Sequence, residues 1–305
     1  MRPFGHFLLS SRLHTIGLVS LTAVISFYLS SVLIALAVMR RGGKFGIQVI
    51  AGCILLLVLA VSLLQRVAVT DVLMNALLAW VPVWCCAMVL RQTESQAAMT
   101  MVAGAFGALF VIMIYVLVDD VPVWWQSWFN EMLNMVIDRN MTGDDAGNVE
   151  RFRAFLTQMA PWINTLIISF LVIRLITVIL IGRWWQAQLF NPGGFRQEFY
   201  ALLLPRFLVY LAVLGVAALL LGDVPELMPV RDLLWLLVIM YLFQGLASVH
   251  RLVRGRELSP AWLVAMYSFL LILFPNMIVF LACIGMADSW VRSKKRRVDS
   301  DTNPQ

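Results

Sequence analysis

Charged residues are scarce in this sequence, and their scarcity excludes a water-soluble globule. Asp, Glu, Lys and Arg make up 13% of the 305 residues, about half of the ~25% that is usual in soluble domains. Hydrophobic residues make up 61%, and the mean hydropathy is +0.86. Because so little charge cannot hydrate the surface of a protein of this size, much of its apolar surface must face lipid.

The side chains that metal sites and many active sites require are also few. The sequence has three histidines, and its four cysteines all lie inside apolar runs without metal or redox spacing. It contains no HExxH metal motif, no GxSxG nucleophile turn and no aspartate pair within an apolar run. We therefore expect no enzymatic activity, no metal and no cofactor. The net charge of +6 lies in short loops, as membrane proteins place it, so we expect no nucleic-acid partner.

Long apolar runs dominate the sequence, and each is near the ~20 residues that cross a ~30 Å hydrocarbon core. Lipid offers backbone groups no hydrogen-bond partner, so runs of this length are expected to be helices. The fold class predicted is an all-α, polytopic transmembrane helical bundle with about eight membrane segments, forming a single domain over residues 1–305. The eight runs are Thr15–Met39, Phe45–Leu64, Val72–Leu90, Ala97–Val118, Pro161–Gly182, Leu202–Gly222, Leu233–Val253 and Pro260–Ala287.

The distribution of charge in the connections predicts their sides in a bacterial inner membrane. Lys and Arg cluster at 40–44, 183–201, 251–259 and in the tail 291–305, which the positive-inside rule places in the cytoplasm. Seven acidic against three basic residues place the connection 119–160 in the periplasm. The last run would be ~46 Å long as one helix, and Pro275 lies at its middle. We therefore expect a hairpin there, which makes nine helices and keeps the tail cytoplasmic.

Two segments outside the spans have a predicted structure of their own. The connection 119–160 is expected to be an amphipathic-helix insertion, with Trp124, Trp125 and Trp128 at the membrane–water interface and a second helix near 150–159. The basic segment 291–305 is expected to be a flexible cytoplasmic tail. Whether the 25-residue first run is one span or two short helices stays open.

The most distinctive segment follows the fifth run, where paired tryptophans precede an Asn-Pro-Gly-Gly turn. Its glycines, flanked by arginines, could form an anion-binding nest. The alternative is an aromatic-and-arginine belt before a tight turn, which we favour because the spacing of a phosphate loop is missing. Positive φ is expected at Gly194. The residues of this loop motif are Arg183, Trp184, Trp185, Asn191, Pro192, Gly193, Gly194, Arg196 and Glu198.

These residues carry a resemblance to a known family. The stretch RWWQAQLFNPGGFRQEF resembles a signature of the YybS-like family of bacterial inner-membrane proteins, and YLFQGLA from Tyr241 is similar to its penultimate span. The segment GMADSW, with Gly285, Asp288 and Trp290, resembles its C-terminus. Leu203 departs from the pattern, which often has arginine there. The family is often grouped with the substrate-binding S components of vitamin-uptake transporters, so the resemblance implies a binding pocket among the spans.

Polar residues at membrane depth are the candidates for binding a ligand. Arg174 lies in mid-span, where arginine costs about 2.5–3.5 kcal/mol and usually faces a partner or a cavity. Snorkelling toward the nearby helix end is the alternative, and both stay open. Asn164, Gln244 and Asn276 complete the candidate set, although Gln244 and Asn276 could simply link helices.

Two functions are compatible with these sequence features. The first is a small-molecule-binding or transport component, with a polar-lined cavity under the Trp-rich loop. The alternative is a non-transporting assembly or interaction protein, which docks a membrane or cytoplasmic partner or anionic lipid through the Pro-Gly-Gly loop and the basic tail. The lipid bilayer is a partner in both.

Overall fold

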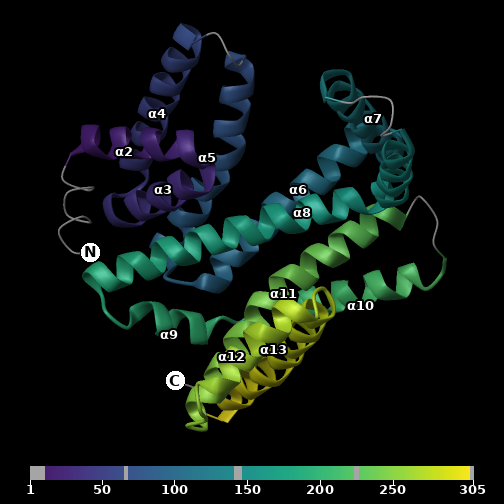
Figure 1. The fold of residues 1–305 in the computed structure, drawn as a ribbon. Helices are drawn as coiled ribbons and strands as arrows, with labels where there is room; N and C mark the ends of the chain where they lie inside the picture. Colours follow the sequence, from purple (N-terminus) through teal and green to yellow (C-terminus); the bar gives the residue numbers. More distant parts are fainter. Residues whose placement is uncertain (1–10, 65–67, 141–145, 223–226, 303–305) are drawn as a thin grey trace.

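The computed structural model describes residues 11–64, 68–140, 146–222 and 227–302, and the predicted all-α class is confirmed (Figure 1). Within these residues the chain forms helices and no strands. The helices are α2 (Arg12–Ile25), α3 (Phe27–Arg41), α4 (Gly43–Leu64), α5 (Val69–Thr93), α6 (Gln96–Leu117), α7 (Val121–Asn140), α8 (Ala146–Phe190), α9 (Gly194–Ala201), α10 (Phe207–Leu219), α11 (Met228–Gly255), α12 (Ala261–Ile272) and α13 (Asn276–Thr302).

Helix length and composition agree with a polytopic membrane protein. Among the described residues, α4, α5, α6, α8 and α11 are long and apolar enough to cross a bilayer, and α2, α10 and α12 are shorter apolar helices. Large hydrophobic side chains, such as Leu63, Val116 and Leu221, lie exposed on or beside these helices. A lipid environment accounts for an outward-facing apolar surface of this extent.

The first apolar run is two helices, and Ser26 separates them. Its backbone is extended, with φ −163° and ψ 124°. Its amide donates to the Thr22 carbonyl at 2.7 Å and ends α2, while its hydroxyl accepts the Tyr28 amide at 3.2 Å and caps α3. A serine can therefore break the run without Gly or Pro, because its side chain satisfies a free amide at the helix start.

The last run forms the predicted hairpin, and its second arm packs against α11. Helix α12 ends at Ile272, and α13 begins at Asn276 and runs beside α11 in the same direction (Figure 1). A Cβ added to Gly245 would overlap the Leu281 carbonyl, and one added to Gly285 would overlap the Tyr241 carbonyl. We call this close approach the α11–α13 seam. Helix α13 continues to Thr302, so its backbone is helical through most of the tail expected to be flexible.

Residues 150–159 are helical as predicted, but the boundary predicted at Pro161 is wrong, because one helix continues through this proline. Helix α8 has 45 residues, which corresponds to ~68 Å. Proline removes one backbone hydrogen bond within a helix, and packing across this position holds the helix together. Ala160 is buried with Ile114, Val121 and Trp125, so α6 and α7 brace α8 beside the proline.

Arginines gather at one end of the bundle. Arg183, Arg251 and Arg292 lie at the end where α9 packs, and Arg40 there stacks over the Phe190 ring at 4.2 Å. We call this the α9 end. The opposite end, where α6 stops and α11 begins, lies beneath α7, and we call it the α7 end.

Candidate functional site

A pocket of about 620 Å³ lies at the α9 end, between α8, α9, α11 and α12. We call it the α9 pocket. Most of its walls are aromatic or aliphatic, and Arg196, His250 and Gln188 supply polar groups. Its lining residues are Thr177, Leu180, Trp184, Ala187, Gln188, Gly193, Phe195, Arg196, Phe199, Tyr200, Phe243, Leu246, His250, Leu263 and Tyr267.

The turn before α9 sets the position of the part of the pocket wall that α9 forms. Gly193 has φ +94° and is the residue before α9, and the Gly194 amide donates to the Asn191 carbonyl at 3.1 Å. The predicted positive φ at Gly194 is therefore wrong by one residue, because Gly194 is already the first helical residue. Left-handed backbone at Gly193 reverses the chain and lays α9 across the end of α8.

An ion pair clamps α9 to α8. The Arg183 Nε donates to the Glu198 carboxylate at 2.8 Å, its Nη2 donates to the other oxygen, and its Nη1 reaches Gln186 at 2.5 Å. Such a two-pronged pair fixes orientation as well as distance. The clamp also neutralises Glu198. Within the described residues Arg196 makes no ion pair, so it is a free cation on the pocket wall.

Aromatic contacts order the inside of the pocket. Phe195 and Phe199 stack with ring centroids 5.9 Å apart. His250 lies between Phe199 at 5.7 Å and Tyr267 at 5.8 Å, and its Nδ1 is 2.8 Å from the Leu246 carbonyl. These contacts join three helices around one aromatic lining.

A second polar site lies at the α7 end, around a carboxylate that the sequence patterns did not reveal. Asp232 is fully buried and accepts hydrogen bonds from Tyr115 Oη at 2.9 Å, from Asn164 Nδ2 at 2.5 Å and from the Thr165 hydroxyl. These groups come from α6, α8 and α11. With Arg231, they form what we call the Asp232 centre.

Arg231 is held beside this carboxylate rather than on it. Its Nε is 4.0 Å from an Asp232 oxygen, its Nη2 donates to the Pro161 carbonyl, and its guanidinium lies 4.4 Å over the Trp162 ring. Asn164 Oδ1 and Arg231 Nε are buried and have no hydrogen-bond partner among the described residues. An unsatisfied acceptor and donor within one buried cluster are unusual.

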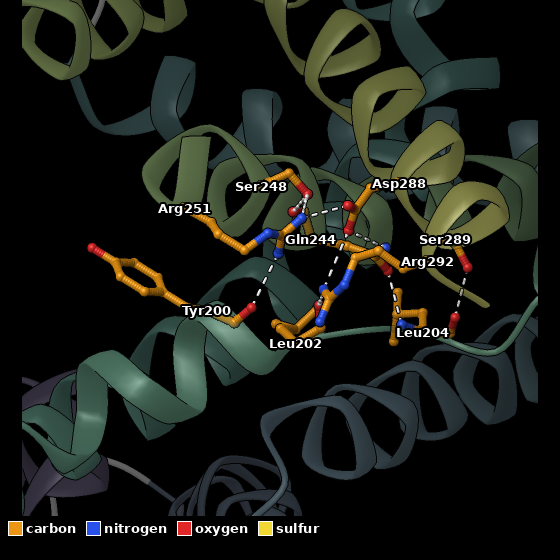
Figure 2. A network of polar contacts seen from close by, with 9 residues as sticks. All are labelled: Tyr200, Leu202, Leu204, Gln244, Ser248, Arg251, Asp288, Ser289 and Arg292. Atoms are coloured by element: carbon orange, nitrogen blue, oxygen red, sulfur yellow. Dashed lines mark hydrogen bonds and ion pairs between the residues drawn. The ribbon is translucent and has the colours of Figure 1, made fainter. Parts of the chain in front are cut away.

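A third group of polar contacts, the Asp288 network, joins α11 to α13 (Figure 2). Asp288 pairs with Arg251, accepts from Gln244 at 3.2 Å, and lies 3.5 Å from Arg292, four residues further along α13. The Gln244 oxygen accepts the Leu204 amide at 2.8 Å. Within this network the side chains pair and hydrogen-bond with one another. Its geometry is therefore that of a structural contact that holds α11 and α13 together.

The network also holds the extended chain between α9 and α10. Ser289 donates to the Leu204 carbonyl at 2.7 Å, and Arg292 donates to the Leu202 carbonyl at 3.2 Å. Arg251 donates to the Tyr200 carbonyl at 3.0 Å. Backbone carbonyls without a helix partner are thereby satisfied, and α9 is fixed from this side too.

The four candidate ligand residues do not line one cavity. Asn164 belongs to the Asp232 centre, and Gln244 belongs to the Asp288 network. Arg174 lies ten residues from Asn164 on α8, ~15 Å along the axis, with its Nη2 3.4 Å from the Ser31 hydroxyl. Asn276 is exposed at the start of α13.

The motif residues separate into different roles. Trp184, Gly193 and Arg196 line the α9 pocket, while Asn191 and Pro192 are exposed at the turn. Trp185 packs against the main core. Gly285 lies in the α11–α13 seam, and Trp290 has its ring 5.8 Å from that of Tyr210. The motifs that carry the resemblance thus lie partly in the wall of the α9 pocket and partly in the neighbouring Asp288 network.

Long apolar helices, with charged side chains buried in pairs or networks between them, define this chain as a multi-pass α-helical membrane protein. It belongs to the DUF2232 family of predicted membrane proteins, whose model matches residues 10–289. The match covers the α9 pocket, the Asp232 centre and the Asp288 network up to Ser289. Comparison with curated proteins and with solved structures gives no significant match.

Proposed function

We propose that this protein binds a small amphipathic molecule with an anionic group in the α9 pocket, as the binding component of a membrane transport system. The pocket itself carries the proposal. Its volume of about 620 Å³ lies within the ~300–1,000 Å³ of ligand sites, which are mostly apolar with a few polar groups. Arg196 supplies a free positive charge.

The resemblance to the YybS-like family, and its grouping with S components, supports a binding pocket among the spans. The sequence has no ATP-binding motif, so ATP-driven transport would need other subunits. The most distinctive sequence motif also supports the proposal, because Trp184, Gly193 and Arg196 form part of the pocket wall.

The orientation in a bacterial inner membrane is part of the proposal. The α9 end, with its concentration of arginines, would face the cytoplasm, and α7 would face the periplasm. Ser127→Cys and Ser259→Cys, each in a chain without native cysteines, test it with an impermeant maleimide on intact cells. Labelling is expected at position 127 alone. Labelling at position 259 from outside would invert the topology.

The binding proposal is tested with protein purified in mild detergent. Native mass spectrometry is expected to find a bound small molecule on the wild-type chain. Leu246→Trp fills the pocket from α11 and is expected to remove that mass. Leu252→Trp is the matched control, because Leu252 is 48% exposed on the same helix and does not line the pocket. A wild-type chain without bound ligand, or a Leu246→Trp chain that keeps it, contradicts the proposal.

The second candidate is a docking protein that binds a partner through the same turn. Asn191 and Pro192 are exposed, as a docking loop requires. A photocrosslinking residue at Pro192 would then trap a partner in cells, and Leu246→Trp would leave that product unchanged. Loss of the crosslink in the filled-pocket variant would favour the binding function.

A further inference from the structure

The α9 pocket is elongated along α8. Thr177, Leu180, Trp184 and Gln188 line it at spacings of three and four residues, so they share one face of the helix. Thr177 and Gln188 are eleven positions apart, which corresponds to ~16 Å of helix axis. Half of a ~30 Å hydrocarbon core is ~15 Å, so the pocket extends about as deep as one leaflet.

Polarity changes along this length. Near the open end, Gln188, Arg196 and His250 contribute polar groups. Deeper in, Leu180, Phe243 and Leu246 form apolar walls. Thr177 lies at the deep end, where its hydroxyl donates to the Ile173 and Arg174 carbonyls and accepts from Tyr28, so it offers a ligand little polar capacity. A polar molecule placed this deep would lose hydration without compensation.

The charge at the mouth of the pocket is positive. Arg196 is exposed and has no acidic partner among the described residues, while Glu198 is neutralised by Arg183. The Arg254 guanidinium lies 5.9 Å from the ring centroid of Tyr200, another lining residue. The mouth therefore attracts an anionic group, while the interior accepts a hydrocarbon chain.

From this geometry we infer that the ligand is a single-chain anionic lipid. Its chain lies along α8 toward Thr177, and its head group lies at Arg196. This inference rests on the proposed function and specifies its substrate class. A volume of about 620 Å³ suits one chain with its head group. The pocket is about as deep as one bilayer leaflet. We therefore expect the lipid to enter the pocket from the surrounding membrane.

The test uses the full chain in nanodiscs of zwitterionic phosphatidylcholine, with dodecyl phosphate as the probe. Wild-type protein is expected to bind the probe saturably. Arg196→Gln is expected to weaken binding about tenfold, the loss expected for one charge-assisted hydrogen bond. Arg256→Gln removes an exposed arginine at the same end of the bundle, outside the pocket, and is expected to bind as the wild type does.

Two further ligands identify what the pocket recognises. Dodecyl maltoside has the same chain with a neutral head, and equal binding of both detergents would overturn the role of charge. Inorganic phosphate has the charge without the chain, and competition by millimolar phosphate would assign the site to a free anion. Leu246→Trp is expected to abolish probe binding while the protein stays folded.

The lipid inference and the binding function fail in different ways. If dodecyl phosphate does not bind, but a different molecule co-purifies and is lost in Leu246→Trp, the lipid class is wrong and the binding function stands. If neither the probe nor any co-purifying molecule depends on Leu246, both are wrong.

Discussion

A carboxylate lies near each end of α11, one on the helix itself and one on α13, and the two are held in different ways. Asp288, toward the C-terminal end of α11, pairs directly with Arg251 and Arg292, and its neighbours are satisfied by one another and by backbone carbonyls. Asp232, near the N-terminal end of α11, is held by three neutral donors, while Arg231 stays 4.0 Å away. In the Asp288 network the charged groups are paired with one another. In the Asp232 centre, Arg231 Nε and Asn164 Oδ1 have no hydrogen-bond partner among the described residues.

This difference leads us to expect that the two centres contribute differently to the stability of the fold. Replacing a complete buried ion pair by apolar residues is often neutral or stabilising, whereas removal of one partner costs several kcal/mol. The Asp288 network ties α9, α11 and α13 together and should therefore be needed for folding. The Asp232 centre joins α6, α8 and α11 in a region that apolar side chains could fill.

The largest effect is expected in the α11–α13 seam, beside the Asp288 network. Gly245→Val should abolish folded protein, because its side chain would overlap the Leu281 backbone, which cannot move aside as a flexible side chain can. Gly255→Val is the control, since a Cβ there meets nothing within 4 Å. Yield and monodispersity after extraction measure the effect, and wild-type yield for Gly245→Val would mean that the seam is not tightly packed.

Removing the Asp288 carboxylate should have the next largest effect. Asp288→Ala leaves Arg251, Arg292 and Gln244 without their shared acceptor, and we expect a loss of about 3 kcal/mol in the free energy of unfolding. Asp71→Ala, at an exposed aspartate of α5, should change it by less than ~0.5 kcal/mol. Unfolding in mixed micelles measures both, and equal values would remove the network's structural role.

A smaller effect is expected when the whole charge pair of the Asp232 centre is replaced. Asp232→Leu alone should destabilise the protein, because Arg231 is 8% exposed and would be left without its countercharge. With Arg231→Met added, stability should return to the wild-type value or exceed it by ~1 kcal/mol. A double variant as unstable as Asp232→Leu would make this centre a structural contact as well, and the two carboxylates would no longer differ in role.

The smallest effect is expected at Arg174. Arg174→Leu should change stability by no more than ~0.5 kcal/mol, because its contact with Ser31 is a long hydrogen bond of 3.4 Å. The insertion cost of a mid-span arginine also disappears. Membrane abundance, together with complementation of a deletion strain, measures the result. Normal abundance without complementation would give Arg174 a functional role after all.

Sequence patterns predicted the helices well where composition alone decides. The apolar runs, the hairpin at Pro275 and the helical α7 all follow from run length, proline and periodicity. The single α8 could not be predicted, because Pro161 usually marks a boundary and the apolar cluster that braces it comes from α6 and α7. The break at Ser26 cannot be predicted from composition, because serine ends a helix through the geometry of its side chain.

The candidate site was less predictable, for a physical reason. Asn164 can be predicted because it interrupts an apolar run. Asp232 cannot, because it directly precedes the run Leu233–Val253 and a charged residue there indicates the end of a span. Adjacent Arg231 and Asp232 were the available signal, as a neutral pair can lie inside a span at lower cost than one charge. The α9 pocket forms where four helices pack together, and local sequence patterns do not reveal such tertiary contacts.

Helix α8 has a mechanical consequence. A rod ~68 Å long that tilts by about 5° moves one end by ~6 Å relative to the other. Its first half packs against α7, and its last turns are clamped to α9 through Arg183 and Glu198. Helix α8 is thus one continuous element that contacts α7 at one end of the bundle and α9 at the other.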